Sequence, residues 1–134
     1  MLTFNEIVDT FSRINPNKVV VNDENRKITY KELSNYGNLL SLYLFKLGLR
    51  KGDRVAFLAH NCAEYAEIFY ATSKVRALIV PVNFRLEMGE IVELFKDAKP
   101  KFFIFQSKFK KVYAELLNKS LIRKKNCISI NNNS

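Results

Sequence analysis

Glycine is scarce in this sequence, and its residues are far apart. The four glycines stand at positions 37, 48, 52 and 89. No two of them are near enough to form a loop that cradles phosphate groups with backbone amides. No apolar run approaches the roughly 20 residues that span a bilayer. The first six residues, 1–6, lack the basic patch and apolar core of a secretory signal. We therefore expect a cytoplasmic protein without a phosphate-binding loop.

Histidine and cysteine are also rare. The chain has one histidine, His60, and two cysteines, Cys62 and Cys127, which are too few for a disulfide framework and fit a reduced compartment. His60 and Cys62 suggest half of a thiol–imidazole pair, but no third orienting group is evident, and a polar strand end is the simpler interpretation. No spacing of His, Cys and carboxylate residues is typical of a metal site. We predict no catalytic, cofactor-binding or metal-binding residue in this chain.

Acidic residues are nearly absent from the last third of the chain. Residues 99–134 hold 9 Lys and Arg against 1 acidic residue, whereas residues 1–98 hold 13 against 12. The net charge of +9 therefore belongs to the C-terminal region. Clustered basic residues bind phosphates, but a solvated helix and a basic, Asn-rich end explain the pattern better, because the nearby aromatic residues Phe102, Phe103 and Phe105 lie in an apolar strand and not between basic residues. We expect no specific nucleic-acid partner.

The most informative stretch runs from Lys51 to Asn61. Lys51-Gly52-Asp53 has turn chemistry, and residues 54–59 are a short, nearly unbroken apolar run. Such a run is typical of a buried strand in a parallel sheet. Asn61, with Glu64 three residues later, then favours the start of a helix over residues 62–75. The stretch predicts a turn, a buried strand and a helix.

The first 50 residues predict a helix, a hairpin and a longer helix. Capping boxes are expected at Thr3 with Glu6 and at Thr29 with Glu32, with staples Leu2–Ile7 and Ile28–Leu33 beside them. The first helix should stop at Pro16, and residues 19–21 and 26–29 should pair as a small hairpin. The second helix should bury Leu33, Tyr36, Leu40, Tyr43 or Leu44, and Leu47, and stop at Gly48. Close packing is the expected reason for Gly37 in its middle.

Strands and helices alternate from residue 54 onward. Further buried strands are expected at 77–81 and 101–105, and a last short one at 127–130. Helices are expected around Met88–Ala98 and after Ser107, which is placed as a cap. Short connections between these elements predict a mostly parallel α/β sheet with helices on both faces, preceded by the small N-terminal hairpin.

Several motifs of this chain, in order, resemble those of the adenylate-forming (AMP-binding) superfamily, and of its acyl-CoA synthetases in particular. The motifs are Asn15–Lys18, Thr29–Leu33, Leu47-Gly48, Lys51–Ala56, Asn61 with Glu64, Lys74, and Val80–Leu86. The resemblance covers about residues 15 to 106 and implies the opening subdomain of such an enzyme. Two departures are notable: Arg76 stands where the family usually has glycine, and Glu87–Glu90 replaces a Thr-Pro-Glu-Glu helix start.

The resemblance implies a carboxylic or fatty acid as substrate, with ATP, Mg²⁺ and coenzyme A used by the full-length family. The ATP-binding loop and the C-terminal domain of that family are missing here, so we expect a fragment that is inactive alone and needs no cofactor. Residues 1–120 are expected to form the partial AMP-binding subdomain, and 121–134 a basic, Asn-rich end. Expected partners are the remainder of a synthetase or a second copy, contacted through an open strand edge near Lys101–Phe105. The alternative is a small stand-alone α/β binding module whose basic end contacts an acidic partner.

Overall fold

The chain forms two units, one mainly helical and one built on a parallel sheet. The computed structural model describes residues 3–22, 26–60 and 63–130. The first unit comprises residues 1–51 and 61–77, and the second comprises residues 52–60 and 78–134. Within the described residues, no helix is long and apolar enough to cross a membrane.

The first unit contains three helices and the predicted hairpin. Its elements are α1 (Phe4–Ile14), β1 (Val19–Asn22), β2 (Lys27–Thr29), α2 (Tyr30–Lys46) and α3 (Glu64–Val75), with β1 and β2 antiparallel. Both predicted capping boxes are confirmed. The Thr29 hydroxyl accepts from the Glu32 amide at 3.1 Å, and the Glu32 carboxylate accepts from the Thr29 amide at 3.0 Å. These local side-chain bonds satisfy amides that a helix start leaves free.

The core of the first unit forms where α2 meets α3. Its buried residues include Val8, Ile28, Leu33 and Tyr70. Gly37 lies against the Tyr70 ring so closely that a Cβ there would be 2.8 Å from two ring atoms and closer still to a third. The predicted reason for Gly37 is therefore confirmed.

The predicted inner face of α2 is partly wrong. The buried residues are Leu33, Gly37, Ser41 and Leu44, whereas the Tyr36 side chain is 44% exposed. The buried line of this helix therefore combines leucine with small residues, and the large aromatic side chains lie outside it. Gly48 ends the helix with a φ of 110°, as predicted, because a left-handed residue there is least costly for glycine.

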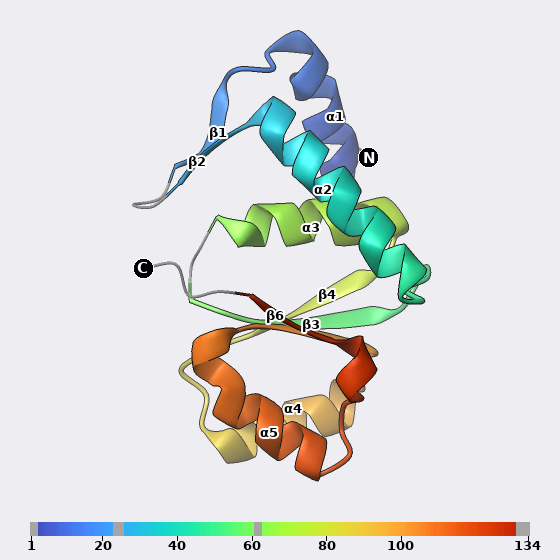
Figure 1. Ribbon diagram of the computed structural model, residues 1–134, viewed down its shortest axis with the longest axis vertical. Helices are drawn as coiled ribbons and strands as arrows, with labels where there is room; N and C mark the ends of the chain where they lie inside the picture. Colours follow the sequence, from blue (N-terminus) through green and yellow to red (C-terminus); the bar gives the residue numbers. More distant parts are fainter. Residues whose placement is uncertain (1–2, 23–25, 61–62, 131–134) are drawn as a thin grey trace. The chain divides into compact units, whose positions relative to one another are not determined.

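The second unit contains a four-stranded parallel sheet in the order β4-β3-β5-β6. Its elements are β3 (Arg54–Leu58), β4 (Leu78–Val82), α4 (Met88–Ala98), β5 (Phe102–Gln106), η1 (Ser107–Phe109), α5 (Lys110–Asn118), η2 (Lys124–Asn126) and β6 (Cys127–Ile130). Figure 1 shows α4 and α5 on the same face of this sheet. The predicted α/β class and the parallel pairing of the three main strands are confirmed, with β3 between β4 and β5.

Two predictions about strand position are wrong. β4 was expected to be a fully buried strand, but it is an edge strand and Leu78 at its start is 55% exposed. Pro81 lies within β4, and proline is tolerated on an edge because it has no amide to donate. Conversely, β5 was expected to leave an open edge, but β6 pairs with it through Ile104 and Ile128.

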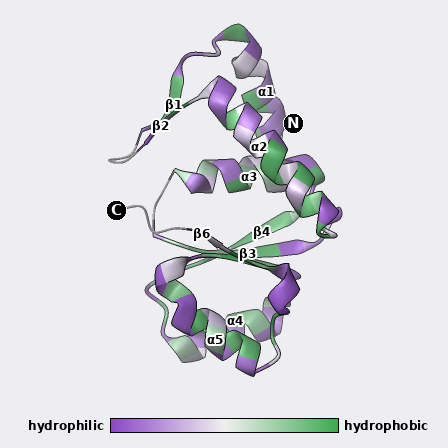
Figure 2. Ribbon diagram, in the orientation of Figure 1, coloured by the Kyte–Doolittle hydropathy of each residue, from purple (hydrophilic) through white to green (hydrophobic). Residues whose placement is uncertain are grey.

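The core of the second unit lies between its sheet and α4 and α5. It includes Leu58, Phe95, Phe103, Phe105 and Leu116. The strands are coloured mostly as hydrophobic in Figure 2, while α4 and α5 mix hydrophobic and hydrophilic residues. Amphipathic helices of this kind place one apolar stripe on a sheet and leave the other face polar.

Several helix ends differ from the predictions. The cap of α5 is Phe109 without a side-chain hydrogen bond, so Ser107 begins a 3₁₀ turn instead of capping the helix. At α4 the Glu90 carboxylate accepts from the Glu87 amide at 3.0 Å, which replaces part of the capping that the missing threonine would supply. Arg76 ends α3 in the left-handed region with a φ of 64°. Leu2, Asn61, the hairpin turn at 23–25 and the Asn-rich end at 131–134 lie outside the described residues.

Candidate functional site

A polar and aromatic cluster lies at the carboxyl ends of the strands in the second unit. His60 follows β3, Phe84 follows β4, and Gln106 ends β5. The His60 amide donates to Gln106 Oε1 at 2.7 Å, and Gln106 is only 6% exposed. Parallel sheets bind ligands at this edge, where the carboxyl ends of the strands meet. The cluster is therefore the natural first candidate for a functional site.

The His60 ring is held by its neighbours on three sides. Its centroid lies 4.0 Å from that of Phe84 and 5.6 Å from that of Phe109. The Lys108 ammonium is 2.9 Å from Nδ1. Because an ammonium group only donates, Nδ1 accepts and the neutral ring carries its proton on Nε2. This contact orients the His60 ring and makes Nε2–H its donor group.

The alternative of a thiol–imidazole pair involves Cys62, which lies outside the described residues. The other cysteine, Cys127, begins β6, and its thiol donates to the Arg123 carbonyl at 3.2 Å. Burial raises the pKa of Cys127 to about 11. A thiol with a raised pKa is a poor nucleophile at neutral pH, so Cys127 has a packing role.

A second polar cluster surrounds Tyr70 in the first unit. The Tyr70 hydroxyl donates to Asp9 Oδ1 at 2.5 Å, and the Ser34 hydroxyl lies 3.4 Å from the same oxygen. Lys74 donates to the Asn38 side-chain oxygen. Burial first, and then the hydrogen bond to Asp9, raise the pKa of Tyr70 to about 12. The phenol therefore stays protonated and joins α1, α2 and α3 as a structural donor.

Replacing Tyr70 by phenylalanine should reveal this hydrogen bond through a pH dependence. At pH 7 we expect a loss of about 1–3 kcal/mol in the free energy of unfolding, because Asp9 loses a buried donor. The folded-state pKa lies above the ordinary value of 10, so the contribution of the phenol is complete below pH 10 and falls as the pH rises toward 12. The advantage of the unmodified chain should shrink by about 2 kcal/mol across that window.

Urea unfolding between pH 7 and 12 measures this difference. Tyr43→Phe is the matched control, because the Tyr43 side chain is 52% exposed. Its difference from the unmodified chain should stay near zero at every pH. A Tyr70→Phe difference that is independent of pH would contradict the assignment of Tyr70 as a tightly held donor.

The sequence did not identify the groups around His60 as a cluster. Its prediction of no catalytic, cofactor-binding or metal-binding residue stays a prediction. Lys108 and Gln106 stand 48 and 46 residues from His60 along the chain, so their contact depends on strand order. The available signal was local: polar residues directly after each apolar strand run. In the described part of the chain, no group of three or more His, Cys, Asp or Glu side chains is placed to hold a metal ion.

Comparison with known sequences connects this fold to one enzyme family. A 2-succinylbenzoate–CoA ligase from Oceanobacillus iheyensis is 35% identical over 98 residues, which are 72% of this chain and 20% of that protein. A long-chain-fatty-acid–CoA ligase from Mycobacterium tuberculosis is 35% identical over 79 residues, or 59% of this chain and 16% of that protein. The chain spans about a fifth of the length of the curated relatives that it matches.

Solved structures agree with the sequence relatives. A putative long-chain-fatty-acid CoA ligase from Rhodopseudomonas palustris has a TM-score of 0.90 at 26% identity, over 99% of this chain and 34% of that chain. A benzoate CoA ligase from Burkholderia xenovorans has a TM-score of 0.86 at 15% identity, over 97% of this chain and 26% of that chain; that likeness shows the fold alone. The model of the AMP-binding enzyme family matches residues 8–133. The chain therefore belongs to the AMP-binding enzyme family.

Proposed function

We propose that this chain is the opening α/β part of an acid–CoA ligase and that it supplies structure rather than chemistry. In the family reaction, ATP activates a carboxylic or fatty acid as an acyl-adenylate, and the acyl group then passes to coenzyme A. The observation that carries the proposal is the match to a CoA ligase fold over 99% of this chain but only 34% of that ligase.

The residues of this chain support a structural role. The glycines at 37, 48, 52 and 89 are too dispersed for a phosphate loop. Among the described residues, no group of three or more His, Cys, Asp or Glu side chains is placed to hold a metal ion. In the two polar clusters, around His60 and Tyr70, the polar groups hydrogen-bond to other residues of this chain. ATP, Mg²⁺ and coenzyme A therefore belong, in this proposal, to the complete ligase.

The partner of the chain in this proposal is the remainder of a synthetase. Until that partner binds, the chain is expected to self-associate, because β4 has only one neighbour among the described strands and edge strands are available for pairing with another chain. The outward side chain of Leu78 adds apolar surface to that edge. Light scattering on the purified chain measures this association, and a monodisperse monomer would contradict it.

An acid-dependent exchange of pyrophosphate into ATP tests the catalytic half of the proposal. The purified chain, supplied with Mg²⁺, ATP and a panel of aromatic and fatty acids, is expected to show no exchange above a reaction without protein. The DNA that follows the coding region is expected to encode the rest of a synthetase. Exchange by the chain alone would refute the structural role, whereas an unrelated gene downstream would favour the stand-alone binding module.

The second candidate function is a small α/β binding module with a basic end. A specific observation favours it: Arg123 lines a surface hollow together with Lys101, and the lining residues include no acidic side chain. A chain that binds an acidic ligand by itself, without any synthetase remainder, would support this candidate.

A further inference from the structure

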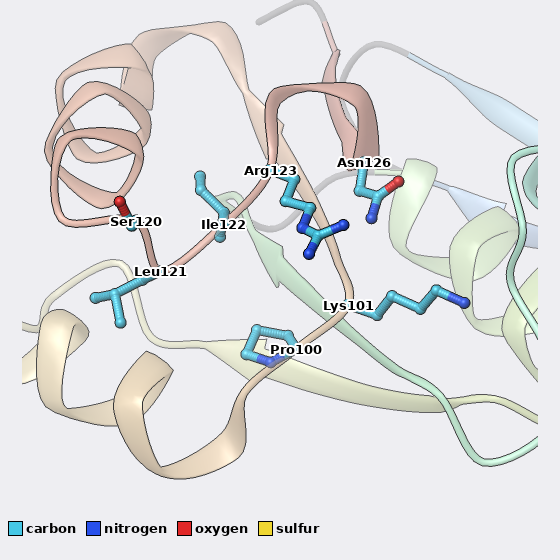
Figure 3. Close-up of a pocket in the computed structure, with 7 residues that line it drawn as sticks. All are labelled: Pro100, Lys101, Ser120, Leu121, Ile122, Arg123 and Asn126. Atoms are coloured by element: carbon cyan, nitrogen blue, oxygen red, sulfur yellow. The ribbon is translucent and has the colours of Figure 1, made fainter.

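A hollow opens in the second unit where the chain enters β5 and β6. It is lined by Pro100, Lys101, Ser120, Leu121, Ile122, Arg123 and Asn126, and is here called the Asn126 hollow. Its volume is about 310 Å³, which is within the range of roughly 300–1,000 Å³ that is usual for small-molecule sites. Figure 3 shows its lining side chains on the two entering segments.

One end of the hollow is cationic. The Arg123 guanidinium and the Asn126 amide lie near each other in Figure 3, and the Lys101 side chain also lines the hollow. Lys101 also lies 3.1 Å from the Asp53 carboxylate, which holds its side chain in place. Among the described residues, no hydrogen bond or ion pair engages the Arg123 guanidinium. Its planar fork is therefore available for an oxyanion.

Asn126 supplies an independent sign of a ligand. The residue is only 8% exposed, and its side chain lines the hollow. Its backbone amide donates to the Arg123 carbonyl at 2.9 Å, but within the described residues its side-chain amide has no partner. Buried polar groups in folded proteins are nearly always hydrogen-bonded, so each exception calls for an explanation. A ligand that accepts from this amide satisfies it.

The other end of the hollow is apolar. Leu121 and Ile122 lie there with Pro100, away from the Arg123 guanidinium in Figure 3. An adjoining hollow of about 360 Å³ shares Pro100, Ser120 and Leu121 and adds Phe95, Lys96 and Lys99. The site as a whole therefore pairs a group of cationic donors with an apolar wall.

We propose that the Asn126 hollow binds a phosphate monoester carried by a small apolar group. A monoester has a charge of about −1.5 to −2 at pH 7 and three acceptor oxygens. Three acceptor oxygens match the fork of Arg123 N–H groups together with the Asn126 amide better than a carboxylate with a single charge does. The apolar group lies against Leu121 and Ile122. This inference does not depend on the ligase assignment.

Titration of the full chain with phenyl phosphate tests the proposal, read out by amide NMR shifts and by the unfolding temperature. Arg123→Gln is expected to weaken binding about tenfold, the usual order for one charge-assisted bidentate contact. Lys125→Gln is the matched control, since it removes the same charge two residues away from a side chain that does not line the hollow; its effect should stay below about twofold. A rise in the unfolding temperature detects binding of phenyl phosphate whether the chain is a monomer or self-associates.

Asn126→Leu separates binding from folding. Leucine has a similar shape and removes the buried amide, so the unfolding temperature should not fall, while phenyl phosphate binding should be lost.

Benzoate and dimethyl phosphate serve as the carboxylate and the diester probes. Saturable binding of phenyl phosphate that is tighter than that of both probes supports the proposal. No saturation at about 10 mM, which lies well beyond a millimolar site, would overturn it. So would equal binding of either probe, or equal losses in Arg123→Gln and Lys125→Gln.

Discussion

Gly37→Ala is expected to lower the free energy of unfolding by about 2–4 kcal/mol, although alanine is normally the better helix former. The added Cβ would lie 2.8 Å from Cγ and Cε1 of Tyr70 and closer to Cδ1. Tyr70 is fully buried and its hydroxyl is held by Asp9, so the ring has no free direction in which to move.

Two limits set the size of this effect. Overpacking a well-filled core costs about 1–3 kcal/mol. Complete expulsion of the ring would cost about as much as truncating a buried aromatic residue, roughly 3–5 kcal/mol. The intrinsic gain of alanine over glycine in a helix recovers only about 1 kcal/mol. The clash with the Tyr70 ring therefore costs more free energy than the higher helix propensity of alanine gains.

Gly89→Ala is the matched control for Gly37→Ala. Gly89 is also a helical glycine, in α4, but a Cβ there would meet nothing within 4 Å. Here only the propensity applies, and we expect stabilisation by about 0.5–1 kcal/mol. Chemical denaturation of both variants measures the contrast. If both variants change the free energy of unfolding in the same direction, the Tyr70 ring does not fix the position of α2.

Local signals in the sequence predicted the elements but not their neighbours. The Thr29 and Glu32 capping box needs only residues three positions apart, so it was predictable. Gly37 was recognised as a packing glycine, but its partner Tyr70 comes from another helix. Arg76 shows the converse: the missing glycine was noted, while the left-handed backbone that glycine would suit appears only in the structure.

Strand order accounts for the remaining differences. Apolar continuity marks β3, β4 and β5 alike, but it does not tell a central strand from an edge strand. The exposure of Leu78 depends on β4 having one partner, and the burial of β5 depends on β6 pairing beside it. The contact of His60 with Lys108 and Gln106 has the same origin, because it requires β3 and β5 to be neighbours. A site formed by residues of different strands is therefore harder to predict from sequence than a helix cap.

Phe103→Ala is expected to lower the free energy of unfolding by about 3–5 kcal/mol, the range for a fully buried aromatic residue. Phe103 is 0% exposed in β5 and lies opposite Ala56 of β3. Its ring meets Phe95 of α4 edge-on at 5.1 Å and stacks on Phe105 at 5.0 Å. Phe105 in turn stacks on Tyr113 of α5 at 4.9 Å. Truncation therefore removes the ring that contacts α4 and that supports the Phe105 ring, which in turn contacts α5.

The small side chain of Ala56 opposite Phe103 limits how far the sheet can close the resulting cavity, which places the expected loss in the upper half of that range. Phe103→Leu keeps most of the volume and should cost less than about 1.5 kcal/mol. Urea denaturation of both variants, followed by circular dichroism, measures the difference. Equal losses for alanine and leucine would mean that the aromatic contacts, and not the filled volume, stabilise this core. A loss below about 1 kcal/mol for alanine would mean that the Phe103 site collapses freely and that this ring does not hold the sheet to α4.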